Sequence, residues 1–162
     1  MQEECEIVEA DLDRADHQEA VRALTAAYAL DPMGNGAPLA AGVLERLIPG
    51  LRAHPTTLIF LAYRRGEPIG LATCFRGFST FAALPIVNIS DLAILPECRG
   101  RGFGRQLLSA VERKARTLGC CRLTLEVQEN NESARRLYEE FGFSQAVYGP
   151  TTGGSLYYWK TI

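Results

Sequence analysis

The chain has 162 residues, of which 47% are hydrophobic. It is therefore long enough to bury about two thirds of its unfolded surface in one core, and a single domain over residues 1–162 is expected. The formal net charge of -2 gives no reason to expect the basic face of a nucleic-acid-binding protein, so no nucleic-acid partner is predicted.

The first third of the chain predicts a strand and two helices. We expect the strand over Cys5 to Ala10 and a helix from about Asp13, where apolar residues begin to recur at helical spacing. The Pro- and Gly-containing segment 31–36 ends this helix. A second helical pattern follows, and we expect it to end at Pro49 and Gly50.

The middle of the chain predicts three strands. Two β-rich runs, Thr57 to Tyr63 and Pro68 to Phe75, are separated by a Gly-containing turn and form an expected hairpin. A third strand is expected over Ile86 to Leu95. Its apolar phase shifts by one residue near Ser90 and Asp91, which predicts a β-bulge of the kind that re-aims strands beside active sites.

The last third predicts two helices and three strands. A helix follows a Gly-rich loop, and a strand over residues 123–127 comes next, because its apolar and polar residues alternate. A further helix is expected to be capped by Asn131 and ended by Gly142. Two closing strands, over Phe143 to Tyr148 and Ser155 to Ile162, complete the order βααβββαβαββ.

Glycines and arginines alternate in the loop at residues 99–105, where a strand ends and a helix begins. Glycines let backbone N–H groups converge on a ligand, and the helix start adds unsatisfied donors and a positive dipole end. Arginines at that end are unfavourable by roughly 0.3–1 kcal/mol each unless an anion is bound. The residues are Arg99, Gly100, Arg101, Gly102, Phe103, Gly104 and Arg105. The loop therefore predicts a phosphate site, although a plain strand-to-helix turn with solvated arginines is the alternative.

The residue types and glycine spacing of this loop argue against two common phosphate-binding motifs. A Walker loop needs GxxxxGK followed by Ser or Thr, and this loop has neither the Lys nor the hydroxyl. A dinucleotide fingerprint needs GxGxxG, whereas this loop is GxGxG and Glu126 lies at the far end of the next predicted strand.

The segment from Arg99 to Gly104, after a strand ending in Leu92-Ala93-Ile94-Leu95-Pro96, resembles the acetyl-CoA motif of the GNAT superfamily of N-acetyltransferases. The resemblance runs from Asp91 to Phe143 and covers about a third of the chain closely. Its further matching residues are Val127, Asn131, Ala134, Tyr138, Gly142 and Phe143.

This resemblance implies an α/β fold: a central, mostly antiparallel sheet with a splayed parallel pair of strands and helices on both faces. It also implies an acetyl-CoA co-substrate held by the backbone of the splayed strand, the glycine-rich loop and the following helices. The implied cofactor-binding residues are Leu92, Ala93, Ile94, Arg99, Gly100, Arg101, Gly102, Phe103, Gly104, Arg105, Asn131 and Tyr138.

Catalytic roles follow from the same resemblance. The N–H of Leu92 or a neighbour would face the acetyl oxygen, and Tyr138 corresponds to the general acid of the family, although it could be a core residue alone. Asp91 and Glu126 are the candidates for the base that deprotonates the amine, with the position of Asp91 favoured. Either carboxylate could instead attract a cationic acceptor or pair with arginine.

The implied reaction is acetyl transfer to a primary amine of a small molecule or peptide. A non-catalytic acyl-CoA-binding or sensor module is the alternative, and a nucleotide-binding module is a third. We expect the acceptor to be selected by the first two helices, the closing hairpin and the stretch Phe75, Phe78 and Phe81, although these phenylalanines are more typical of a core. The resemblance also allows a homodimer.

The cysteine and histidine content suggests neither disulfides nor metal. Five cysteines without a CxxC pair, together with only two histidines, favour a reducing cytoplasmic location and no metal cofactor. No apolar run has the length of a signal peptide or membrane span, so no membrane partner is expected.

Overall fold

The computed structural model describes residues 5–147 and 149–162. The chain divides into two compact units, Met1–Gln128 and Glu129–Ile162. The larger unit holds the sheet and three of the helices, and the smaller unit holds the last helix and the C-terminal segment.

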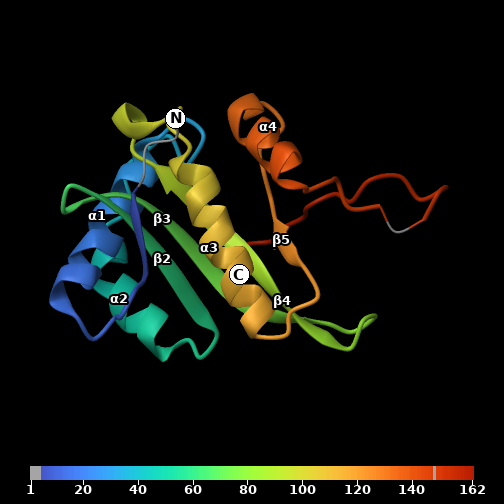
Figure 1. Ribbon diagram of the computed structural model, residues 1–162, viewed down its shortest axis with the longest axis horizontal. Coiled ribbons are helices and arrows are strands. Elements are labelled where there is room, and N and C mark those ends of the chain that lie inside the picture. The colour runs from blue at the N-terminus through green and yellow to red at the C-terminus, as the bar shows by residue number, and fades with distance from the viewer. Residues whose placement is uncertain (1–4, 148) are drawn as a thin grey trace. The chain divides into compact units, whose positions relative to one another are not determined.

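The larger unit is built on a mixed sheet whose strand order in the described residues is β1-β2-β3-β4-β5 (Figure 1). Neighbouring strands run antiparallel from β1 to β4, whereas β4 and β5 run parallel. The strands are β1 (Glu6–Glu9), β2 (Thr57–Arg64), β3 (Glu67–Ser79), β4 (Leu84–Ile94) and β5 (Leu123–Leu125). This arrangement confirms the expected mostly antiparallel sheet with one parallel pair.

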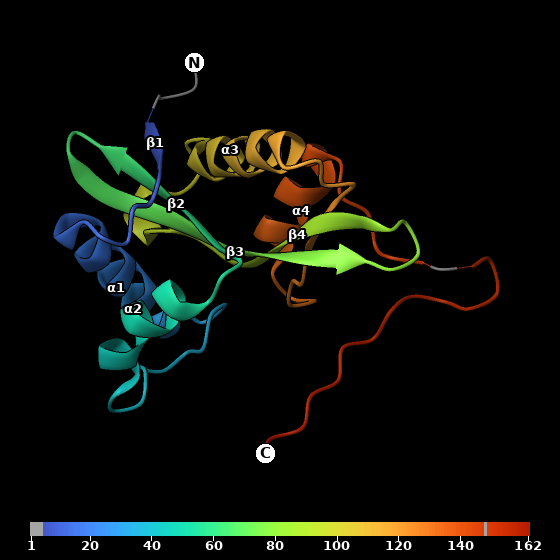
Figure 2. The same cartoon turned by 90° about the horizontal axis from the view of Figure 1, so that it is seen from below.

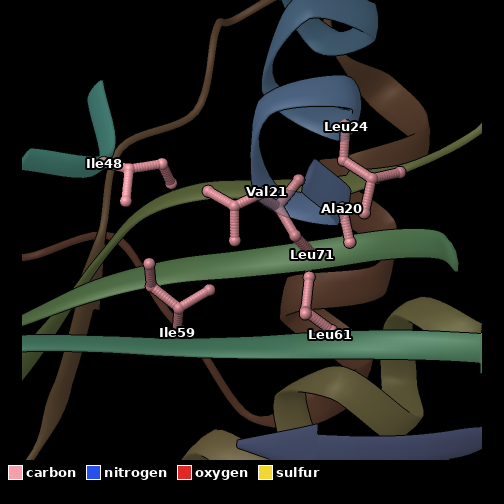
Figure 3. Packing of buried hydrophobic residues seen from close by; sticks show 7 residues of the cluster. All are labelled: Ala20, Val21, Leu24, Ile48, Ile59, Leu61 and Leu71. Carbon is pink, nitrogen blue, oxygen red and sulfur yellow. The ribbon is translucent and has the colours of Figure 1, made fainter. Parts of the chain in front are cut away.

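Helices cover both faces of this sheet. Helices α1 (Ala15–Leu30) and α2 (Val43–Ala53) lie on one face, and α3 (Phe103–Thr117) lies on the other (Figure 2). Between α1, α2 and the sheet a buried cluster comprises Ala20, Val21, Leu24, Ile48, Ile59, Leu61 and Leu71 (Figure 3). Burial of each large aliphatic side chain contributes about 1.5–3 kcal/mol.

Helix α2 corrects one expectation. It was expected to end at Pro49 and Gly50, but it continues to Ala53. Leu51 packs against the buried cluster, and its carbonyl accepts a hydrogen bond from the Thr57 hydroxyl at 2.8 Å. This packing on both sides of Pro49 outweighs the backbone hydrogen bond that proline cannot donate.

Strand β4 contains the predicted bulge. Ile89 pairs with Cys74 and Asp91 with Thr73, so Ser90 is the extra residue on β4. The extra residue inverts the alternation of the strand, and this inversion is what the shift in the apolar pattern indicated.

Strands β4 and β5 separate after a short paired stretch. Their register runs from Val87 with Leu123 to Ile89 with Leu125. β4 then continues to Ile94 along β3, with no β5 partner among the described residues. β5 was expected to reach Val127, but it ends at Leu125 because its pairing with β4 stops there.

The phenylalanines of the β3–β4 hairpin do not belong to the core, contrary to expectation. β2 pairs with β3 only as far as Phe75, so the rest of β3 and the start of β4 form a two-stranded arm. Phe78 and Phe81 are 62% and 92% exposed on this arm. Phe75, at its base, makes an edge contact with His54 at 4.9 Å between ring centroids.

The smaller unit is organised by α4 (Glu132–Phe141). Asn131 caps it, because its side-chain oxygen accepts a hydrogen bond from the Ala134 N–H at 3.2 Å. Gly142, at φ 107°, ends it, and both of these boundaries were predicted.

The two predicted closing strands do not form in the described residues. A single bridge joins Val147 to Gly154 there, with a hydrogen bond from the Ser155 N–H to the Ala146 carbonyl. Residues 155–162 alternate too little for one buried face, because their large apolar side chains follow one another and are exposed. The expected end of the first strand, Tyr148, lies outside the described residues.

Membrane-spanning helices and clusters of metal-ligating side chains are both absent from the described residues. No helix there combines the length and the apolar character needed to cross a membrane. No group of three or more His, Cys, Asp and Glu side chains in that part of the chain is arranged to hold a metal ion.

Candidate functional site

The glycine-rich loop connects the end of β4 to α3 through a short 3-10 turn at Pro96–Cys98. Gly100 and Gly102 have φ angles of 75° and 85°, in the left-handed region where side chains are strained. Gly102 is the N-cap of α3, so no side chain caps the first turn of that helix. A Cβ atom built on Gly100 would meet nothing within 4 Å. The loop thus presents a backbone surface at a helix start, which suits a phosphate group.

The other residues of the loop divide between the core and the surface. Phe103 is buried, and the guanidinium of Arg64 lies 6.0 Å from the centre of its ring, so its side chain anchors the start of α3. Gly104, Arg101 and Arg105 are half-buried around that start. Of the predicted cofactor residues here, Phe103 can contribute only its backbone to a ligand.

Further along α3 two cations pair with carboxylates. Lys114 contacts Glu9 at 2.7 Å, and Arg116 pairs with Glu112 one turn away. The positive charge that the sequence places in this region is therefore partly neutralised toward the end of the helix.

The open part of β4 directs backbone groups away from β3. The Leu95 N–H donates to the Ile69 carbonyl on β3 at 2.9 Å. Because backbone groups alternate in direction along a strand, those of Ala93 also point toward β3. The backbone groups of Leu92 and Ile94 point toward the open edge. Ala93 packs against the buried cluster. The structure therefore brings the backbone of Leu92 and Ile94, two of the three predicted residues, to the edge that β5 leaves unpaired.

Arg99 turns its side chain back toward β4 and α1. Its Nε donates to the Ile94 carbonyl at 2.9 Å, and its terminal nitrogen pairs with the Asp31 carboxylate. The guanidinium holds the pKa of Asp31 below its ordinary value, chiefly through this hydrogen bond. Asp31 begins the segment 31–36 that follows α1, which we call the strap.

Asp91 lies directly after the bulge, at the start of the open edge. Burial raises the pKa of its carboxyl above the ordinary value of 3.8. Its charge in turn adds to the effect of burial in raising the pKa of Tyr28 on α1, and that of Cys74 to about 12. The carboxylate of Asp91 is therefore close enough to the phenol of Tyr28 for its charge to affect that group.

The second candidate base, Glu126, has a different environment. It is exposed and lies just beyond the end of β5. The two carboxylates therefore differ in burial, and Asp91 has the environment that raises the pKa of a carboxyl.

The remaining predicted site residues belong to the smaller unit. Asn131 is occupied as the cap of α4. Tyr138 is buried in α4, and its ring makes an edge contact with Phe143 at 5.8 Å between centroids.

Sequence reasoning missed three residues that the structure brings to this region: Tyr28, Asp31 and Gln128. Tyr28 looked like an ordinary helix-face residue, and Asp31 looked like part of a helix-ending turn. One signal was present, because a carboxylate at the C-terminal end of a helix is unfavourable without a cation nearby. Gln128 carried no local signal at all.

Known proteins resemble this chain in sequence and in fold. The uncharacterized N-acetyltransferase YhfO of Bacillus subtilis is 35% identical over 55% of this chain and 60% of its own length. The aminoalkylphosphonate N-acetyltransferase of Salmonella typhimurium is 33% identical over 54% of this chain and 57% of its own length. The matched region thus spans somewhat more than half the length of these curated relatives.

A solved structure of AAC(6')-Iy with the bisubstrate analogue CoA-S-monomethyl-acetylneamine shares the fold. Its TM-score is 0.74 at 22% identity, covering 99% of this chain and 100% of that one. The sequence profile described as "Acetyltransferase (GNAT) family" matches residues 18–143, which is most of the chain. The chain therefore belongs to the GNAT family of acetyltransferases.

Proposed function

We propose that this chain transfers an acetyl group from acetyl-CoA to a primary amine of a small molecule or peptide. The observation that carries the proposal is the continuity between the open edge of β4 and the glycine nest at the start of α3. An extended ligand bearing amide groups can pair with the open edge of β4, and a pyrophosphate can bind at the glycine nest.

Donor binding would rest mainly on backbone groups. The left-handed glycines Gly100 and Gly102 remove side chains from the nest, and the helix dipole favours an anion there. Arg101 and Arg105 add positive charge at the same helix start. Leu92 and Ile94 would supply strand-type hydrogen bonds to the pantetheine arm, because they face the open edge.

Leu92 would also stabilise the transition state. The amine nitrogen attacks the thioester carbonyl, the C–N bond forms, and negative charge develops on the carbonyl oxygen before the C–S bond breaks. A backbone N–H held in place by the sheet needs no reorganisation to meet this charge. One such donor is commonly worth about 2.7–4 kcal/mol of barrier.

Proton transfer would involve two further residues. Asp91 is the proposed base, because burial raises its pKa toward the range where a carboxylate removes a proton from an ammonium group efficiently. Glu126 is the alternative base, and because it is exposed it would accept the proton through a water molecule. Tyr138 is the proposed acid that protonates the departing CoA sulfur, on the basis of its position seven residues after Asn131 in the family pattern.

The acceptor is proposed only as a class. A cationic amine suits the Asp91 carboxylate, and the Salmonella relative carries the name of an aminoalkylphosphonate acetyltransferase. A cytoplasmic location and a homodimeric state remain predictions from the sequence.

A thiol-release assay over a panel of amines tests the proposal. The panel would contain aminoalkylphosphonates, aminoglycosides, polyamines and peptides with a free amino terminus, each with acetyl-CoA at saturation. We expect CoA release above the no-amine rate for at least one class, together with an acetylated product in the mass spectrum. Tight acetyl-CoA binding without turnover of any amine would instead identify a non-catalytic acyl-CoA-binding module.

A further inference from the structure

The strap, residues 31–36, is attached to the sheet at two points. The Asp31 carboxylate pairs with Arg99, which follows β4. The Gln128 side-chain amide, which follows β5, donates to the carbonyls of Met33 at 3.1 Å and Gly34 at 3.3 Å. The strap therefore contacts the segments that follow β4 and β5, the two strands that separate at the open edge.

The strap is also compact in itself. The Met33 N–H donates to the Asp31 side chain at 2.8 Å, and the N–H groups of Gly34 and Gly36 donate to the Asp31 carbonyl at 2.9 and 3.0 Å. A Cβ on Gly34 would lie 2.0 Å from the Tyr28 carbonyl oxygen, so the strap packs tightly on the end of α1. Asp31 is thus the centre of the strap, and Arg99 is its charged anchor.

Arg99 is better placed for this anchor than for an anionic ligand. Its Nε and a terminal nitrogen are both engaged, by the Ile94 carbonyl and by Asp31. The Asp31 side chain is only 7% exposed, so this carboxylate depends on its cation. Asp31 lies at the C-terminal end of α1, where the helix dipole disfavours a negative charge, and Arg99 lies shortly before the N-terminal end of α3, where the dipole disfavours a positive charge. Their ion pair neutralises both charges.

The end of α1, on which the strap packs, lies against the open part of β4. Tyr28, in the last turn of α1, lines a cavity of about 10 Å³ together with Ala93, Ile94 and Arg99. The phenol of Tyr28 responds to the charges of both Asp91 and Asp31. The strap therefore packs on a helix end that lies against Ala93 and Ile94, the residues of β4 that follow Asp91.

We infer that Arg99, acting through Asp31, and Gln128 are positioning residues that hold the strap beside Asp91, so that the Arg99 side chain serves the acceptor side of the site and not the pyrophosphate. This inference rests on the proposed function. The backbone N–H groups of the glycine nest would carry donor binding without the Arg99 side chain.

Hydrogen–deuterium exchange tests the anchor without any need for an acceptor. In the wild-type protein the N–H groups of Met33, Gly34 and Gly36 are hydrogen-bonded within the strap. Replacing Arg99→Met, Asp31→Asn or Gln128→Met should raise exchange in peptides covering the strap about tenfold. Arg113→Met, an exposed arginine on α3, is the matched control and should leave exchange unchanged.

Binding and kinetics then separate the two roles of Arg99. Arg99→Met and Asp31→Asn should each keep the calorimetric Kd for acetyl-CoA within about twofold of wild type. Both should lower kcat/KM for the fastest amine of the panel by about tenfold, and the double variant should be little worse than either single variant. Arg99→Lys, which keeps the charge, should recover part of that loss.

One pattern would overturn the inference: Arg99→Met weakens acetyl-CoA binding about tenfold or more, while Asp31→Asn changes neither exchange nor acceptor kinetics. That pattern would make Arg99 a pyrophosphate ligand. A wild-type protein that failed to bind acetyl-CoA would overturn the proposed function itself, and this failure is distinguishable because it appears before any variant is made.

Discussion

At the scale of single residues, Asp91 shows how burial and chemistry oppose each other. Burial raises the pKa of its carboxyl, so the folded protein binds a proton there more tightly than the unfolded chain does. The ionised carboxylate that a base requires therefore costs stability at neutral pH.

Asp91→Asn should accordingly stabilise the protein and inactivate it. Tm should rise at pH 7, and the gain over wild type should shrink as the pH falls through the raised pKa, because wild-type Asp91 is then also neutral. The value of kcat/KM should fall by about 10²–10⁴, as expected for a lost general base. Glu126→Gln is the matched control, and a larger loss of activity in that variant would reassign the base.

Tyr138→Phe separates the proposed acid from a packing role. The ring would keep its edge contact with Phe143, so the variant should still fold, and Tm measures any loss of stability. The value of kcat should fall by about 10²-fold or more if the phenol donates a proton to the leaving sulfur, while acetyl-CoA affinity stays the same. Full activity in the variant would show that Tyr138 is a core residue alone.

At the scale of elements, the predictable parts were those with a local signal. The bulge at Ser90 appeared as a shift in apolar phase, and the limits of α4 appeared as Asn131 and Gly142. The end of α2 was mispredicted because the contacts of Leu51 outweigh the local effect of Pro49. The closing strands were predicted from residue types alone, and these do not specify a pairing partner.

The strap illustrates what local patterns cannot reveal. Arg99 and Asp31 are 68 positions apart, and Gln128 is a further 29 residues beyond Arg99. Each residue type was readable, but the pairing arises only when α1, β4 and β5 come together. The predicted role of Arg99 as a pyrophosphate ligand followed from its place in the motif, and its side-chain contacts favour a different role.

Gly34→Ala tests how tightly the strap is packed. The added Cβ would lie 2.0 Å from the backbone oxygen of Tyr28, which cannot move aside without distorting α1. We expect a loss of about 1–3 kcal/mol in the free energy of unfolding, measured by urea denaturation. Gly50→Ala in α2, where a Cβ meets nothing within 4 Å, should instead gain about 0.5–1 kcal/mol. Equal effects of the two substitutions would contradict this packing.

At the scale of the whole molecule, the net charge of -2 is an average that does not reveal the cluster of arginines at residues 99–105. Lys114 and Arg116 are paired with carboxylates, and Arg99 is paired with Asp31, so part of the positive charge in this region is matched within the fold. The average charge gave no reason to expect a nucleic-acid partner, and it could not indicate the proposed phosphate site, whose main donors would be backbone N–H groups.

Family membership and fold are established for this chain, whereas its reaction is a proposal. The single domain expected over residues 1–162 stays a prediction beside the two compact units of the structure. The acceptor could not be predicted, because the residues that would select it follow no shared motif.

Calorimetric titration of the wild-type protein and Gly100→Val with acetyl-CoA tests the central claim most directly. Gly100 has a φ of 75° and open space around it, so valine would strain the loop and occupy the nest without disturbing the core. We predict that wild type binds acetyl-CoA and binds neither ATP nor NAD comparably, and that the variant binds acetyl-CoA at least about tenfold more weakly. Equal affinity of the two proteins for acetyl-CoA, or no binding by wild type, would contradict the assignment of this loop.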